Sequence, residues 1–136
     1  MDIDEAREFI KDNPRCVLAT RRRDGAPQMS PVVSALDGDG HLLISSRETA
    51  IKTKNARRDP RVSVCFLKSE FFGGFVQVDG SAEIVSLPDA MEILIDYYRR
   101  LSGEHPNWDD YRESMEREKR CVIRVTIERA GPNVSG

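Results

Sequence analysis

The chain has 136 residues, of which 39% are hydrophobic and 32% are charged, and its formal net charge is -2. This length and balance predict one globular domain spanning residues 1–136. A nucleic-acid-binding protein is usually basic overall, and no apolar run here reaches the ~18 residues of a membrane span, so we expect neither kind of partner. The N-terminal segment is acidic and amphipathic, unlike a signal peptide.

Three cysteines, Cys16, Cys65 and Cys121, each lie in an apolar, strand-like run. Their odd number and the lack of C-x-x-C spacing argue against a disulfide framework or a zinc site. The two histidines, His41 and His105, are far apart and have no potential ligands at metal-binding spacing. We therefore expect buried, reduced thiols in a cytoplasmic protein, and no metal.

The first half of the chain predicts one helix and three strands. Residues 3–12 carry apolar side chains at helical spacing. Strands are expected at residues 15–20, 27–36 and 41–46, because turn signals at Asp24-Gly25 and at residues 37–40 separate them. Two short turns in succession indicate a meander of antiparallel strands.

The second half predicts a helix up to Arg58, ended by Asp59-Pro60, and strands at residues 61–67 and 74–85. A longer helix is expected between Ser86 as N-cap and Gly103, with Pro88 in its first turn. A short helix from Asn107 and a strand at residues 121–128 follow. Six strands with helices inserted between them predict an α+β fold, an antiparallel barrel whose closure removes the sheet edges.

The most conspicuous polar feature is the cluster of five cations Lys52, Lys54, Arg57, Arg58 and Arg61. Free N–H groups at a helix N-terminus, with hydroxyls and cations around them, stabilise a phosphate. Ser45, Ser46 and Thr49 supply hydroxyls near the start of this helix. The residues alone leave open whether the cluster binds an anion or is a solvated helix face.

A second candidate is the segment GAPQMSPV, in which Gln28, Ser30 and Pro31 interrupt an apolar strand. Such a strand suits the edge of a flat heterocycle, and an ordinary half-exposed strand with a bulge at Pro31 is the alternative. The sequence has none of the common hydrolase, zinc-protease or nucleotide-binding motifs, so we assign no catalytic residue.

The motifs VLAT, GAPQMSPV, LLISS, KTKNARRDPRVSV and GSAEI, in this order, resemble those of the pyridoxamine 5′-phosphate oxidase-like superfamily. The segment RRLSGEHPNWDDYRESM is similar to that of its actinobacterial branch, whose members use the deazaflavin coenzyme F420. The resemblance covers residues 9 to 128 and implies a six-stranded antiparallel split β-barrel of the FMN-binding type. It also implies a homodimer with two cofactor sites at the subunit interface.

By this resemblance, three groups of residues would bind the cofactor. Lys52, Lys54 and Asn55 would hold its phosphate and acidic tail, and Gln28, Met29, Ser30 and Pro31 would line the deazaflavin ring. Ser45 and Ser46 would lie near the ribityl chain and phosphate, while Phe75 and Gln77 would close the site from the other subunit. F420 carries a phosphodiester and a glutamate tail, which explains the basic cluster.

The implied activity is transfer of a hydride from reduced F420 to an electron-poor small molecule of the enone, quinone, coumarin or tetrapyrrole type. The alternatives are an FMN-binding flavoprotein of the same fold and a non-catalytic binder of F420 or another anion. Two departures from relatives stand out. Ala50 occupies a position where relatives often have arginine, leaving Arg47 as a substitute, and the C-terminal IERAGPNVSG lacks the R-L-x-P-type segment of true pyridoxamine phosphate oxidases.

Overall fold

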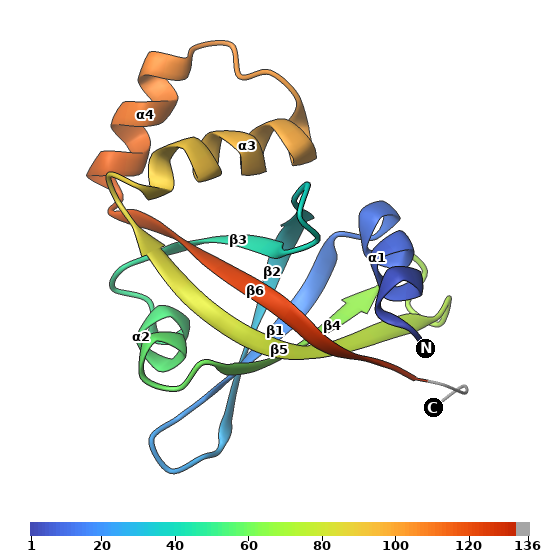
Figure 1. Cartoon of the computed structure of the whole chain (residues 1–136). Coiled ribbons are helices and arrows are strands. Elements are labelled where there is room, and N and C mark those ends of the chain that lie inside the picture. The colour runs from blue at the N-terminus through green and yellow to red at the C-terminus, as the bar shows by residue number, and fades with distance from the viewer. Residues whose placement is uncertain (133–136) are drawn as a thin grey trace.

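The computed structural model describes residues 1–132, so the last four residues of the C-terminal segment discussed above lie outside the described range. Within residues 1–132, six strands close into one barrel and four helices lie around it (Figure 1). The elements are α1 (Ile3–Asp12), β1 (Arg15–Arg21), β2 (Pro27–Leu36), β3 (Leu42–Arg47), α2 (Ile51–Arg58), β4 (Arg61–Leu67), β5 (Phe75–Ser86), α3 (Ala90–Ser102), α4 (Trp108–Arg117) and β6 (Arg120–Gly131).

All neighbouring strands are antiparallel, and they close in the order β1-β2-β3-β6-β5-β4. The α+β six-stranded barrel and the β1-β2-β3 meander predicted from the sequence are therefore confirmed. The predicted turns form where expected, with Gly25 at φ 88° and Gly40 at φ 82°, backbone conformations that favour glycine. Closure pairs β3 with β6, which places the end of the chain beside its middle.

Alternate residues of the strands fill the barrel interior, where Leu18, Ile44, Phe66 and Ile123 are completely buried. α1 and α2 lie at opposite ends of the barrel and contribute Ala6, Ile10 and Ala56 to the same core. The two helices thus close the ends of the barrel.

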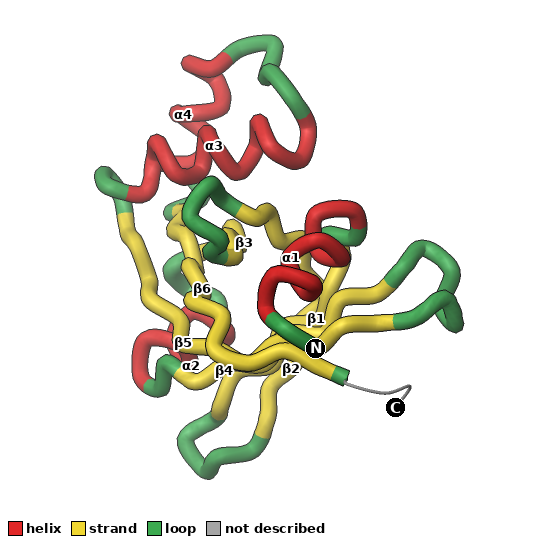
Figure 2. Tube along the Cα trace, turned by 45° about the vertical axis from the view of Figure 1, so that its right-hand side comes forward, coloured by secondary structure: helices red, strands yellow, loops and turns green. Residues whose placement is uncertain are grey.

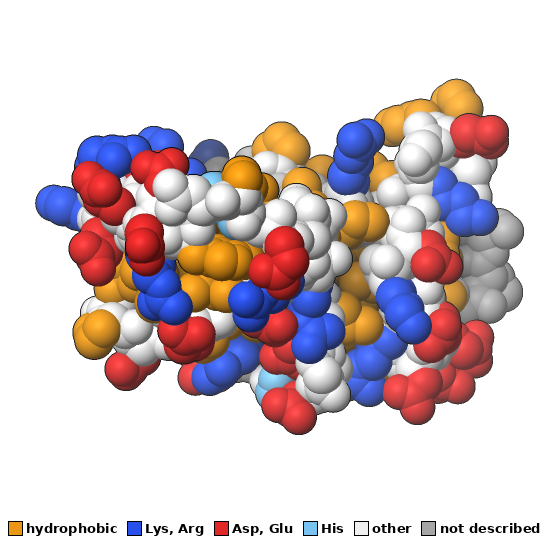
Figure 3. All heavy atoms as spheres, turned by 90° about the horizontal axis from the view of Figure 1, so that it is seen from above, with side chains coloured by type: hydrophobic (Ala, Val, Ile, Leu, Met, Phe, Trp, Pro, Cys, Tyr) orange, Lys and Arg blue, Asp and Glu red, His pale blue; other side chains and the backbone are white. Residues whose placement is uncertain are grey.

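A second core lies outside the barrel, between the sheet and the layer formed by α3 and α4 (Figure 2). It includes Leu43 and Val122 from the strands and Leu94 and Tyr111 from the helices. The outer surface of this layer carries interspersed acidic and basic side chains (Figure 3), among them the pairs Arg99–Glu104, Arg100–Asp96 and Arg112–Glu92. Three basic side chains of this end are therefore paired with acidic neighbours.

The predicted start of the long helix was wrong. Ser86 is the last residue of β5, and its hydroxyl donates to Glu48 Oε1 at 2.6 Å instead of capping a helix. α3 begins four residues later, after Asp89, whose side chain makes no capping hydrogen bond. The hydroxyl is taken by a long-range partner that sequence spacing does not reveal. The predicted end at Gly103 and the N-cap Asn107 of α4 are confirmed.

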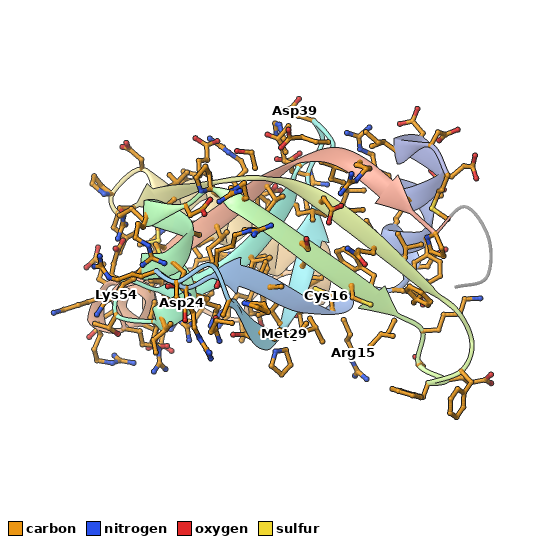
Figure 4. The ribbon with its side chains drawn as sticks, turned by 90° about the horizontal axis from the view of Figure 1, so that it is seen from below. Arg15, Cys16, Asp24, Met29, Asp39 and Lys54 are labelled. Carbon is orange, nitrogen blue, oxygen red and sulfur yellow. The ribbon has the colours of Figure 1, made fainter. Side chains whose placement is uncertain are left out.

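The outer face of β1, β2, β4 and β5 is not part of the core under α3 and α4, and it is rich in exposed apolar side chains. Met29 on β2 is 65% exposed, and Phe71 and Phe72 in the β4–β5 connection are 73% and 96% exposed. Val33 and Phe75 add further apolar surface. In Figure 4, Met29 and Arg15 both project from this side of the barrel.

Candidate functional site

β2 has a free edge along most of its length. Residues Pro27 to Val33 pair with β1, whereas pairing with β3 begins only at Ser34 and Ile44. Tyr97 of α3 stands where the two strands separate, because its hydroxyl donates to Val33 O at 3.0 Å. Burial raises the pKa of this phenol, which keeps it protonated as a donor. The strand edge consequently offers backbone groups to a ligand.

The four residues predicted to line a ring lie on this edge. Met29 and Pro31 are exposed on the outer face, and Gln28 and Ser30 are half-buried on the opposite face. Gln28 is held by its neighbours, since Thr20 Oγ1 donates to its Oε1 at 3.1 Å and its Nε2 donates to Ser30 Oγ at 2.9 Å. The segment therefore combines apolar surface with oriented polar groups, as heterocycle sites do.

α2 presents an open N-terminus. Ala50 occupies the N-cap position and supplies no side-chain hydrogen bond to the first turn. The amide groups there carry partial positive charge and are free to bind an anion. Lys52, one residue into the helix, is half-buried, and Lys54 is exposed.

The structure divides the five clustered cations into two sets. Arg57 donates to Glu48 at 2.8 Å, and hydrogen bonds from Arg61 lower the pKa of Asp59 to about 2. Arg58 donates to the backbone oxygen of Arg21 and to Asn55 Oδ1. Within residues 1–132, neither Lys52 nor Lys54 forms an ion pair. The two lysines therefore remain for a ligand, whereas Arg58, which also has no acidic partner, is held by two neutral acceptors.

The predicted serines lie on opposite faces of β3. Ser46 is buried with its hydroxyl 2.7 Å from that of Thr53, which in turn donates to Arg47 O at 2.7 Å. These bonds fasten α2 to the end of β3. Ser45 is half-buried on the other face, in register with Val122. The hydroxyl of Ser46 is therefore occupied by a hydrogen bond inside the protein.

Asn55 is also buried, at 5% exposure, and its amide is used internally. Nδ2 donates to Thr20 Oγ1 at 3.2 Å and Oδ1 accepts from Arg58 at 3.1 Å. Sequence reasoning did not identify Thr20 as part of the site. The available signal was a polar residue that continues the buried alternation of Cys16 and Leu18.

Phe75 and Gln77 lie on the outer face of β5, which β1 and β4 separate from β2. Gln77 Nε2 donates to Asp79 Oδ1 at 3.1 Å, and Asp79 also accepts from Ser63 and Arg129. Burial raises the pKa of Asp79, but these hydrogen bonds outweigh it and leave the pKa below 3.8. A groove of about 620 Å³ is lined by Gln77 and Asp79 and extends to Thr20 and Pro27. Within one chain, β4 and β1 therefore separate Phe75 and Gln77 from the free edge of β2.

A family model described as pyridoxamine 5′-phosphate oxidase matches residues 3–132. The chain belongs to this family. The match includes both sides of the candidate site, the free edge of β2 and the basic helix α2. It therefore supports the superfamily resemblance drawn from the sequence motifs.

Several solved structures resemble this chain over nearly its whole length. A conserved hypothetical protein from Mycobacterium tuberculosis is 25% identical, with a TM-score of 0.76 over 100% of this chain and 92% of the other. A structure described as an F420 reductase is 24% identical, with a TM-score of 0.69 over 91% of this chain and 94% of the other. HupZ from Group A Streptococcus is 17% identical, with a TM-score of 0.66 over 96% and 92%. At these identities the last two show the shared fold.

The fold is that of the pyridoxamine 5′-phosphate oxidase family, and a structure described as an F420 reductase shares it. The predicted ring-lining strand β2 and the basic helix α2 lie next to each other in it. No helix within residues 1–132 is long and apolar enough to cross a membrane.

Proposed function

We propose that the protein is an F420H2-dependent reductase that passes a hydride to an electron-poor small organic acceptor of the enone, quinone, coumarin or tetrapyrrole type. The observation that carries the proposal is the pair of unpaired lysines, Lys52 and Lys54, at the open N-terminus of α2. FMN ends in one phosphate, whereas F420 adds a glutamate tail, so two free cations fit the longer anion better. Similarity to an F420 reductase over 91% of the chain adds support.

In this proposal, Lys52 and the first amides of α2 would hold the phosphodiester, and Lys54 would face the tail. The free edge of β2, from Gln28 to Pro31, would orient the ring through backbone groups and exclude water with Met29 and Pro31. Ser45 would lie near the ribityl chain. When bound, reduced F420 supplies the hydride, and the protein supplies position and charge.

The active form in this proposal is a homodimer. An exposed face carrying Met29, Val33, Phe71, Phe72 and Phe75 is costly for a lone protein and suits a self-complementary contact. Phe75 and Gln77 lie on β5, which β4 and β1 separate from β2, so in this proposal they would close the site of the partner subunit. We place the protein in the cytoplasm, with small-molecule substrates.

The test is equilibrium binding of F420 and of FMN to one purified sample, followed by turnover with F420H2 and a panel of enones and quinones. The proposal expects tighter binding of F420 and oxidation of F420H2 that depends on the acceptor. Preferential binding of FMN would favour a flavoprotein, and F420 binding without turnover would favour a carrier. Binding of neither cofactor would overturn the proposal.

A further inference from the structure

A continuous chain of side-chain hydrogen bonds runs from the basic helix to the free edge of β2. Its members, in order, are Arg58, Asn55, Thr20, Gln28 and Ser30. The successive distances are 3.1 Å from Arg58 Nη2 to Asn55 Oδ1, 3.2 Å from Asn55 Nδ2 to Thr20 Oγ1, 3.1 Å from Thr20 Oγ1 to Gln28 Oε1 and 2.9 Å from Gln28 Nε2 to Ser30 Oγ. The chain links the two halves of the candidate site.

The direction of this chain is fixed at its first member. A guanidinium group has only donors, so the atom of Asn55 that meets Arg58 must be its carbonyl oxygen. The amide nitrogen of Asn55 then faces Thr20 as a donor. Thr20 is completely buried, and its hydroxyl, having accepted from Asn55, donates onward to Gln28 Oε1. No water is needed to complete these bonds.

The same logic orients the last two members. Because Gln28 accepts through its oxygen, its nitrogen is directed at Ser30 Oγ, which must accept. The hydroxyl hydrogen of Ser30 has no acceptor among residues 1–132. Ser30 is half-buried on the part of β2 that β3 does not cover. The hydroxyl hydrogen of Ser30 is therefore available to an acceptor at the strand edge. The chain of donors that begins at the Arg58 guanidinium polarises it.

We propose that Thr20, Asn55 and Gln28 are positioning residues that hold the Ser30 hydroxyl as a hydrogen-bond donor to an acceptor atom on the edge of the bound heterocycle. This inference rests on the proposed function and adds a specificity rule to it. The edge that meets Ser30 carries a carbonyl oxygen or an unprotonated ring nitrogen. The arrangement also gives the buried Asn55 a role in the basic helix. Its oxygen accepts from Arg58, and its nitrogen is thereby directed at Thr20.

The test is a double-mutant cycle in which F420 binding is measured by fluorescence titration. Ser30→Ala removes the final donor, and Thr20→Val breaks the relay upstream. Each should weaken F420 binding by about 3- to 10-fold, as loss of one neutral hydrogen bond does. The double variant should bind no more weakly than Ser30→Ala alone, because Thr20 acts through Ser30. Thr20→Ser keeps a hydroxyl and should bind F420 like the wild type. Ser81→Ala is the control away from the relay, because Ser81 is an exposed serine on β5, and it should also bind like the wild type.

The outcomes separate this inference from the proposed function. Wild-type protein that binds neither F420 nor FMN overturns both. Wild-type binding that Ser30→Ala leaves unchanged overturns the donor role of Ser30 alone. Additive losses in the double variant would show that Thr20 acts independently of Ser30 and would also overturn the relay. Thermal unfolding checks each variant, and if Thr20→Val does not fold, Gln28→Leu on the half-exposed strand replaces it in the cycle, with the same outcomes decisive.

Discussion

Replacing Lys52 by alanine tests the anion site most directly. Lys52 is half-buried and forms no ion pair within the described chain, so its contact with a phosphate would be partly shielded from water. A charge-assisted contact of this kind contributes about 1.5–3 kcal/mol, which corresponds to roughly 10- to 100-fold weaker F420 binding in Lys52→Ala. Lys54 is exposed, and an exposed pair contributes only ~0–1 kcal/mol, so Lys54→Ala should cost about 5-fold at most.

The assay is titration of F420 into wild type, Lys52→Ala and Lys54→Ala at two salt concentrations. Lys11→Ala is the matched control, because Lys11 is an exposed lysine in the last turn of α1, at the other end of the barrel. Lysine and alanine have similar helix propensities, so the free energy of unfolding should hardly change in Lys52→Ala. Wild-type affinity should fall with salt, because exposed charges are screened beyond ~10 Å at 0.1 M.

Unchanged affinity in Lys52→Ala, together with wild-type binding that does not respond to salt, would refute this reasoning. The basic helix would then be a solvated surface. An equal loss in Lys11→Ala would point instead to a general effect of net charge. Loss of binding that tracks a lower unfolding temperature would mean that Lys52 stabilises α2 instead of holding the ligand.

Four further predictions concern assembly, the core, the helical layer and pH. Met29→Asp places a charge on the exposed apolar face and should give monomers by sedimentation, with loss of cofactor binding; a monomeric wild type would contradict the dimer. Phe66→Ala empties a fully buried position and should lower the free energy of unfolding in urea by about 3–5 kcal/mol. Trp108 packs edge-on against Tyr98, so Trp108→Phe should change acceptor preference at most, and a rate loss above ~100-fold with intact F420 binding would assign it a catalytic role. The pKa of Asp79 in the folded protein lies below its usual 3.8, so its ionised form stabilises the fold at neutral pH. This stabilisation should fade as the pH falls below about 4 and through the lower folded pKa, and urea unfolding of Asp79→Asn should lack that part of the pH dependence.

The sequence by itself determined the local elements of this protein. Alternation of apolar residues in β1 and β6, glycines at Gly25 and Gly40, and the Asp59-Pro60 stop are short-range signals, since each depends on residues within a few positions. The same signals identified the strand and the helix that form the two halves of the candidate site. The start of α3 was missed because Ser86, a good N-cap by type, binds Glu48 across 38 positions of sequence.

Only the tertiary structure decided which polar groups remain available. Composition gives five cations around α2 equal weight, but the fold pairs Arg57 with Glu48 and Arg61 with Asp59, and leaves Lys52 and Lys54 without acidic partners. The fold also buries Asn55 against Thr20, 35 positions away, and so turns a predicted ligand contact into a link of a hydrogen-bond chain. The bond between Asn55 and Thr20 depends on barrel closure, which brings β1 under α2. Local sequence patterns carry no record of that distance, because the two residues meet only after the sheet has closed.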